Sequence, residues 1–100
     1  RWALWYHVYM TTTKNLLFFY GLECPHCQKM EKLVDTLNTE GFDIEKVECW
    51  HNKGNEELFV KMDCEDEPCG GVPFFVNQKT KKTACGEVTY AELKEWAEGK

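Results

Sequence analysis

The sequence lacks any apolar run approaching the ~20 residues that a membrane-spanning helix needs. It also lacks an excess of basic residues, because 12 Lys and Arg stand against 17 Asp and Glu, for a formal net charge of −5. Binding to nucleic acid depends on Lys and Arg contacts with phosphates. The two shortages predict a chain with neither a membrane nor a nucleic-acid partner.

The first residues lack the small-residue cleavage site of a secretory signal peptide, although they are rich in aromatic side chains. Met10 looks like a natural start, so the residues up to Tyr9 are either a cloning remnant or a frayed arm. Their alternating apolar residues also suit an extra strand. We therefore expect an arm or extra strand over residues 1–14 and one domain over residues 15–100, located in the cytoplasm or an organelle stroma.

Six cysteines in 100 residues are the one feature that suggests a secreted disulfide scaffold. A hydrophobic fraction of 43% with 14% aromatic residues is, however, enough for one small core. The regular strand and helix periods described next favour a core that needs no disulfides for its stability.

The stretch from Asn15 to Leu37 joins a buried strand to a helix. Residues 16–20 form a continuous apolar run, which predicts a strand buried on both faces. Pro25 suits the first turn of a helix, where its missing N–H is no loss. Apolar residues then recur on one helical face: Cys27, Met30, Leu33, Val34 and Leu37. The pattern predicts a helix that stops at Gly41.

Two later helices are predicted from their capping residues. Asn55 is placed to cap a short helix with an apolar stripe formed by Leu58, Phe59 and Met62. Thr89 and Glu92 have the spacing of a capping box. The helix that they begin has an apolar face formed by Tyr90, Leu93, Trp96 and Ala97.

Three more strands complete the predicted fold. Residues 42–49 carry many charges, as an edge strand does. Residues 72–76 and 82–85 have the composition of a hairpin that Gly86 closes. The predicted order is β-α-β-α-β-β-α, in the α/β class, with the first two strands parallel and joined by a right-handed crossover.

The cysteines at the start of the first helix form the candidate catalytic site. Partial positive charge at a helix N-terminus favours the thiolate of Cys24, and Cys27 lies one turn away, where it can close a disulfide. We predict Cys24 as the nucleophile at the exposed end of the turn and Cys27 as the more buried resolving thiol. His26 adds positive charge beside the thiolate, which Glu23 opposes, and a stabilised thiolate makes the disulfide a better oxidant.

In these features the chain resembles the thioredoxin superfamily, at the compact size of the glutaredoxins. The resemblance covers residues 15–98 and rests on the Cys24-Pro25-His26-Cys27 motif, on Gly-Gly-Val72-Pro73 before a later strand, and on the closing hairpin and helix. It implies a thioredoxin-like, mixed four-stranded sheet flanked by helices. It also implies a cis bond before Pro73 and a Val72 backbone that hydrogen-bonds to a substrate chain.

The chain also departs from the family pattern. Phe18 stands where thioredoxins carry a buried aspartate. Cys85-Gly86 stands where glutaredoxins have a Gly-Gly pair that helps to hold glutathione, and of the acidic residues that the family carries shortly after this pair only Glu87 is present. The CPHC tetrapeptide itself is that of the DsbA family of periplasmic disulfide oxidases.

The other cysteines allow several interpretations. Cys64 and Cys69 are a second disulfide, free thiols, or a second redox pair that exchanges with the first. Cys49 and Cys85 lie on or beside predicted strands, so we interpret them as small buried apolar residues. The acidic run 65–67 is a solvated loop or, beside the active site, a surface that favours basic partners.

The resulting hypothesis is an enzyme of cell redox homeostasis, a thiol–disulfide oxidoreductase acting on protein or small-molecule disulfides. It requires no cofactor, and its electrons come from a reductase or from glutathione. The first alternative is a glutathione-coupled glutaredoxin. The second is a non-catalytic thioredoxin-fold module that binds a partner or a metal, including an iron–sulfur cluster between two subunits. We predict no metal site, since the motif has no second pair of ligands and His51 is an isolated candidate beside Trp50, where both residues cover the core.

Overall fold

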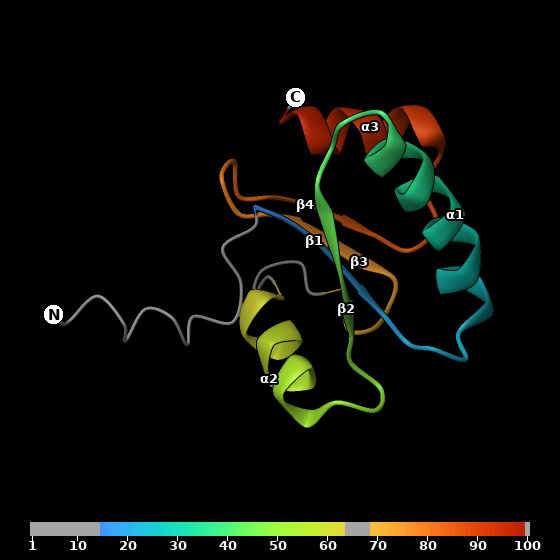
Figure 1. Ribbon diagram of the computed structural model, residues 1–100. Coiled ribbons are helices and arrows are strands. Elements are labelled where there is room, and N and C mark those ends of the chain that lie inside the picture. Colours follow the sequence, from blue (N-terminus) through green and yellow to red (C-terminus); the bar gives the residue numbers. More distant parts are fainter. Residues whose placement is uncertain (1–14, 64–68, 100) are drawn as a thin grey trace, which may run out of the picture.

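The computed structural model describes residues 15–63 and 69–99, and Figure 1 shows their arrangement. Residues 1–14, which we expected as an arm or extra strand, lie outside the described residues. The described elements are, in order, β1 (Leu16–Tyr20), α1 (Pro25–Thr39), β2 (Ile44–Glu48), α2 (Lys53–Met62), β3 (Phe74–Asn77), β4 (Lys82–Cys85) and α3 (Tyr90–Glu98). The predicted order β-α-β-α-β-β-α is confirmed.

The four strands form one mixed sheet in the order β2-β1-β3-β4. β1 pairs with β2 in parallel, with Leu16 opposite Ile44 and Tyr20 opposite Glu48. β1 also pairs with β3, and β3 with β4, in antiparallel fashion. The predicted parallel pairing of the first two strands is therefore confirmed, and β1 lies in the middle of the sheet.

Helices cover both faces of the sheet (Figure 1). On one face Phe18 of β1 packs with residues of α1 and α3, including Val34 and Trp96. On the other face Phe19 packs with residues of α2, including Phe59. Because neighbouring residues of a strand point to opposite faces, a strand covered on both sides is apolar throughout, as β1 is.

The ends of the helices follow local capping chemistry. Gly41, with a φ of +109°, follows the last turn of α1, as predicted. The capping box of Thr89 and Glu92 at the start of α3 is also confirmed. The predicted cap of α2 was wrong: Asn52 is the N-cap, and its Oδ1 accepts the backbone N–H of Asn55 at 3.0 Å. The side-chain amide of Asn55 instead donates to the Glu48 carbonyl, at 2.9 Å.

Two of the predicted strands are shorter than expected. β2 omits the residues on either side of 44–48, and β3 begins at Phe74, after the cis peptide bond between Val72 and Pro73. The predicted cis bond is thus confirmed. No helix within residues 15–63 and 69–99 is long and apolar enough to cross a bilayer.

Candidate functional site

The turn from β1 to α1 places the first cysteine at the start of the helix. The Cys24 N–H donates to the Gly21 carbonyl at 3.0 Å, which reverses the chain after β1. Cys24 is the N-cap of α1, with Pro25 in the first turn, as predicted from its missing N–H. The Cys24 Sγ accepts the backbone N–H of Cys27 at 3.3 Å. A cysteine sulfur thus takes the place of the usual capping oxygen.

Both cysteines of the motif are free thiols and both are buried. Cys27 is 1% exposed, as expected for the resolving thiol, and burial followed by a side-chain hydrogen bond with Cys24 raises its pKa to about 12. Our expectation of an exposed Cys24 was wrong, because it is only 4% exposed. Its side chain turns toward α1 and joins the core cluster, while the flanking Glu23 and Pro25 are exposed.

The carboxylate of Glu48 ties the motif's loop to the end of β2. Its Oε2 accepts the backbone N–H of Leu22 at 3.0 Å and of Trp50 at 3.2 Å. Its Oε1 accepts the backbone N–H of His51 at 2.9 Å. Partial burial acts to raise the pKa of Glu48, but the hydrogen bonds from His51 and Leu22 outweigh it and lower the pKa to about 2. Glu48 is therefore a fixed negative charge beside the cysteine motif.

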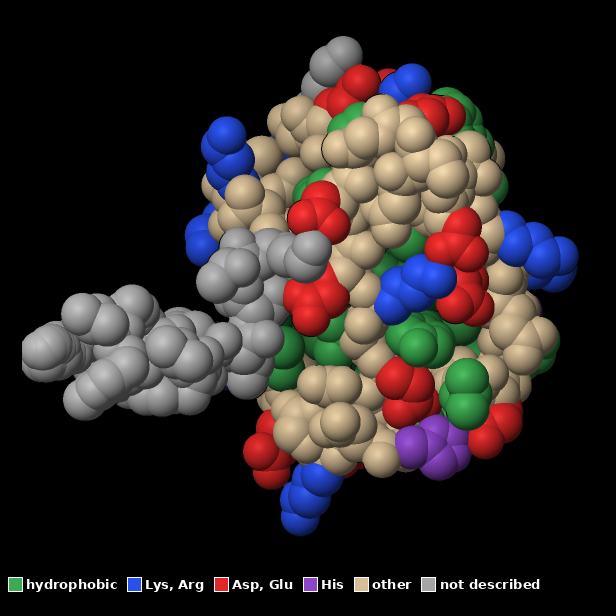
Figure 2. All heavy atoms as spheres, viewed as in Figure 1, with side chains coloured by type: hydrophobic (Ala, Val, Ile, Leu, Met, Phe, Trp, Pro, Cys, Tyr) green, Lys and Arg blue, Asp and Glu red, His purple; other side chains and the backbone are tan. Residues whose placement is uncertain are grey.

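His51 links two carboxylates on neighbouring loops. Its Nδ1 lies 3.0 Å from Glu48 Oε2, and its Nε2 lies 3.1 Å from Glu23 Oε2. The hydrogen bond to Glu48, and then the charge of Glu23, raise the pKa of His51. At the lower right of Figure 2 a histidine lies with acidic side chains on both sides. The predicted role of His51 and Trp50 as a cover holds only in part, since Trp50 covers Gly21 but stays 53% exposed.

His26 has a charged partner that sequence analysis did not assign to it. Its Nδ1 is paired with the Glu87 carboxylate, which also lies 4.0 Å from Lys29 Nζ. The hydrogen bond from His26 lowers the pKa of Glu87, and the charge of Lys29 adds to the effect. The histidine that we expected beside the Cys24 thiolate is thus paired with a carboxylate from the loop after β4.

The same histidine lines an open groove. The groove has a volume of about 350 Å³ and is lined by His26, Val72, Pro73, Gly86 and Glu87. It brings together the motif's His26 and the two residues, Val72 and Pro73, that the family resemblance assigned to substrate binding. The Gly86 N–H donates to the Pro73 carbonyl at 2.8 Å, which joins the two walls.

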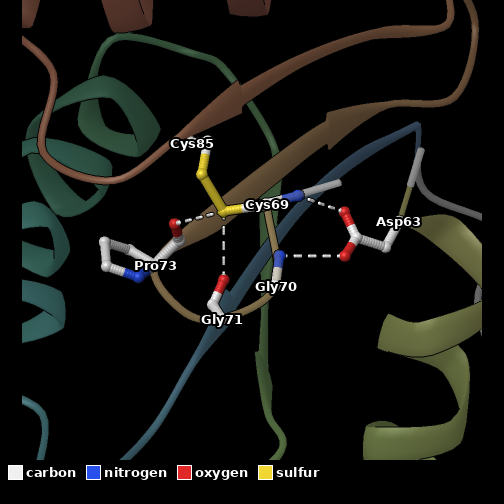
Figure 3. The surroundings of a disulfide bond; sticks show 6 residues. All are labelled: Asp63, Cys69, Gly70, Gly71, Pro73 and Cys85. Atoms are coloured by element: carbon white, nitrogen blue, oxygen red, sulfur yellow. Dashed lines mark hydrogen bonds between the residues drawn. A yellow bond between two sulfur atoms is a disulfide. The ribbon is translucent and has the colours of Figure 1, made fainter. Parts of the chain in front are cut away.

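A disulfide closes the loop that leads into this groove, as Figure 3 shows. It joins Cys69 to Cys85, whose Cα atoms are 5.6 Å apart. Asp63 holds the same loop, since its carboxylate accepts the N–H of Cys69 at 2.7 Å and of Gly70 at 3.0 Å. Cys69 Sγ lies 3.1 Å from the Gly71 carbonyl oxygen, a sulfur–oxygen contact because a disulfide sulfur carries no hydrogen.

This disulfide corrects two interpretations. Cys69 is not paired with Cys64, which lies outside the described residues together with the acidic run 65–67. Cys85 is an exposed disulfide partner and not a buried apolar residue, because it lies at the end of the β4 edge strand, opposite Phe74, and faces the returning loop. Cys49 is buried as predicted, its thiol donates to the Tyr20 carbonyl, and burial raises its pKa to about 11.

Sequence reasoning did not find the carboxylate of Glu48, although a signal was present. Glu48 is the last residue of a strand parallel to the one that leads into the motif, and adjacent parallel strands end at the same edge of a sheet. The described residues contain no group of three or more His, Cys, Asp or Glu arranged to hold a metal ion. Comparison of the chain with protein-family models, with curated proteins and with solved structures finds no match.

Proposed function

We propose that the chain is a thiol–disulfide oxidoreductase that works through Cys24 and Cys27. The observation that carries the proposal is the position of Cys24 as the N-cap of α1, with its sulfur accepting the Cys27 N–H. At that place the backbone stabilises a thiolate, which is the reactive form of cysteine. Cys27, buried and protonated, is close enough to act second.

The proposed reaction has two thiol–disulfide exchanges. The Cys24 thiolate attacks one sulfur of a substrate disulfide, the S–S bond breaks, and the other substrate sulfur leaves as a thiolate. Cys27 then loses its proton to a leaving thiolate and attacks Cys24 Sγ, which releases the second substrate thiol. Two electrons pass to the substrate, and the Cys24–Cys27 disulfide that forms is reduced again by the dithiol of a reductase or by two molecules of glutathione.

The proton transfer in the second exchange has no assistance from β1. Phe18 stands at the position where thioredoxins have a carboxylate that serves as a proton acceptor. Here the side chain is fully buried and stacks on Phe75, with ring centroids 5.0 Å apart. With a pKa of about 12, Cys27 is protonated at neutral pH. The substrate's own leaving thiolate is therefore the proposed proton acceptor.

We further propose that the fold is thioredoxin-like. Support comes from the element order, the mixed sheet with β1 in the middle, and the groove in which Val72 and Pro73 lie beside His26. In this proposal the Val72 backbone pairs with a substrate chain that presents its disulfide to Cys24. Glutathione is a second candidate substrate, because Glu87 lines this groove and Lys29 Nζ lies 4.0 Å from its carboxylate, so that charges of both signs lie at the rim, as a small zwitterionic peptide requires.

The decisive experiment compares single cysteine variants in the reduction of insulin by dithiothreitol. Cys24→Ser should lose at least ~100-fold of the catalysed rate, because the attacking thiolate is gone. Cys27→Ser should accumulate a mixed disulfide through Cys24, detected as an added mass. Cys49→Ser, which removes another buried thiol, is the matched control and should retain the rate. Near-normal turnover by Cys24→Ser would exclude the proposed function and favour a non-catalytic module.

A further inference from the structure

Two large hydrophobic side chains lie exposed beside the cysteine motif. Among the described residues the exposed large hydrophobic side chains are those of Leu22, Trp50 and Val60, at 60%, 53% and 67%. Val60 belongs to α2, whereas Leu22 and Trp50 follow the adjacent parallel strands β1 and β2. Exposed apolar residues that lie together beside a reactive site, rather than scattered singly, are candidates for an interaction site.

The backbone beneath these side chains is held in place. The N–H groups of Leu22 and Trp50 donate to the same atom, Glu48 Oε2, at 3.0 and 3.2 Å. The Glu48 side chain itself is only 18% exposed. One partly buried carboxylate oxygen therefore fixes the backbones of the two exposed residues next to each other. Because this backbone is already ordered, binding a partner costs the chain little backbone entropy, which favours affinity.

The indole of Trp50 packs against the backbone of Gly21 although the side chain is exposed. A Cβ atom at position 21 would overlap the ring, so that only glycine permits this contact. About half of the residue's surface, 53%, is nevertheless open to solvent. Rigid aromatic side chains of this kind supply much of the binding energy of protein interfaces.

The charges around Leu22 and Trp50 favour a partner with positive charge. Glu23 lies between Leu22 and Cys24 in the sequence, and its side chain is 60% exposed. Glu48 adds a second negative charge, and His51 is the group that bridges the two carboxylates. The whole chain is acidic, with a net charge of −5.

We propose that Leu22 and Trp50, with Glu23 beside them, bind an extended segment of a protein substrate in which an apolar residue and a Lys or Arg flank the reactive cysteine. We call these three residues the Leu22–Trp50 surface. The apolar residue of the substrate packs between Leu22 and the exposed part of Trp50, and its cation lies at Glu23. The inference rests on the proposed function and names the substrates that the enzyme prefers.

The test uses three synthetic peptides, each with one cysteine in a mixed disulfide with thionitrobenzoate. The first has Leu and Lys beside the cysteine, the second Ser and Lys, and the third Leu and Glu. The kcat/KM for each peptide is divided by that for hydroxyethyl disulfide, a small neutral substrate. For the wild-type chain this ratio should be about tenfold higher for the Leu-Lys peptide than for the other two, which corresponds to one substantial contact.

Variants then assign the preference to the surface. Trp50→Ala and Leu22→Ser should each remove most of the tenfold advantage of Leu over Ser. Glu23→Gln should remove the advantage of Lys over Glu and leave that of Leu over Ser. Val60→Ser, which removes an exposed apolar side chain from α2, is the matched control and should change none of these ratios. Equal ratios for all three peptides in the wild type, or a preference that survives in Trp50→Ala and Leu22→Ser, would overturn the inference.

Two further measurements separate this inference from the proposed function. Titration of the Leu-Lys peptide with its cysteine replaced by serine measures binding without chemistry, so binding that persists in a chain without turnover supports the surface and rejects only the enzyme. Turnover of hydroxyethyl disulfide without any peptide preference rejects only the surface. Sedimentation tests a second copy as the occupant. A dimer that Trp50→Ala converts to a monomer would show that the surface joins two chains, against the proposal.

Discussion

The two assigned cysteine pairs differ in almost every property that governs sulfur chemistry. Cys24 and Cys27 are free, buried and one helical turn apart, and their chemistry derives from the start of α1. Cys69 and Cys85 are joined over a sequence separation of 16, and Cys85 is exposed. The comparison teaches that a local pair is suited to a reaction, because closing it demands no rearrangement of the fold. A pair that joins distant segments contributes to stability.

The largest expected effect is a difference in alkylation rate between Cys24 and Cys27, the two thiols of the first pair. At pH 7 a thiol with a pKa of about 12 is ionised to roughly one part in 10⁵. Iodoacetamide should therefore alkylate Cys24 at least ~100-fold faster than Cys27, and the Cys27 rate should rise about tenfold with each pH unit. Peptide mass mapping of the labelled chain measures both rates. Equal labelling of the two thiols at pH 7 would remove the distinction between nucleophile and resolving thiol.

An effect of intermediate size, on the free energy of unfolding, is expected when the second pair is removed. Replacing both Cys69 and Cys85 by serine should lower the free energy of unfolding by about 3 kcal/mol, as expected for a closed loop of this length. Urea denaturation measures the change. The double variant should still catalyse the reduction of hydroxyethyl disulfide, because neither residue belongs to the proposed reaction.

The matched double variant exchanges Cys24 and Cys27 for serine. It should lose turnover and lose about 1–2 kcal/mol of stability, less than the other double variant, since serine is nearly isosteric with cysteine but places a hydroxyl in the core. A double variant of the Cys69–Cys85 pair that loses turnover while remaining folded would contradict the division between the two pairs.

The smallest effect concerns His26. In our proposal a protonated His26 stabilises the thiolate and not the uncharged disulfide, and about 1.4 kcal/mol corresponds to roughly 30 mV in the two-electron potential. Because its side chain is 65% exposed and paired with Glu87, we expect His26→Tyr to make the first pair more reducing by only ~10–20 mV. Equilibration with glutathione buffers measures the potential.

Glu87→Gln provides the opposite change. It removes the negative charge that is paired with His26. The potential of the first pair should therefore shift in the oxidising direction, because less negative charge opposes the thiolate. If both variants leave the potential unchanged, His26 is a surface residue with no part in the chemistry, and the first pair depends on the helix alone.

The sequence was sufficient wherever the cause of a structure is local. The continuous apolar run of β1, the glycine after α1 and the capping box of α3 all depend on neighbouring residues, and each was predicted. The cis bond before Pro73 was predicted from the family resemblance alone.

The contacts that escaped prediction join segments far apart in the chain. The pairing of Cys69 with Cys85 needs the return of a loop to the end of β4, and the role of Glu48 needs β1 and β2 side by side. Such partners become neighbours only after the chain has folded. The cap of α2 was wrong at shorter range: Asn52 and Asn55 are both suited to capping, and only the folded chain shows that Asn52 caps the helix while the Asn55 amide donates to the Glu48 carbonyl.

The central place of β1 has a consequence for how the chain is made. β1 is synthesised first among the described strands, but its two neighbours end at residues 48 and 77. The end of β3 lies 57 residues after the end of β1, so at about 5–20 residues per second the edge of β1 that pairs with β3 waits roughly 3–11 s for its partner on the ribosome. Throughout that interval the strand containing Phe18 and Phe19 presents an unpaired, apolar edge. The period of synthesis, before β3 has emerged, is therefore when this edge of β1 is open to aggregation.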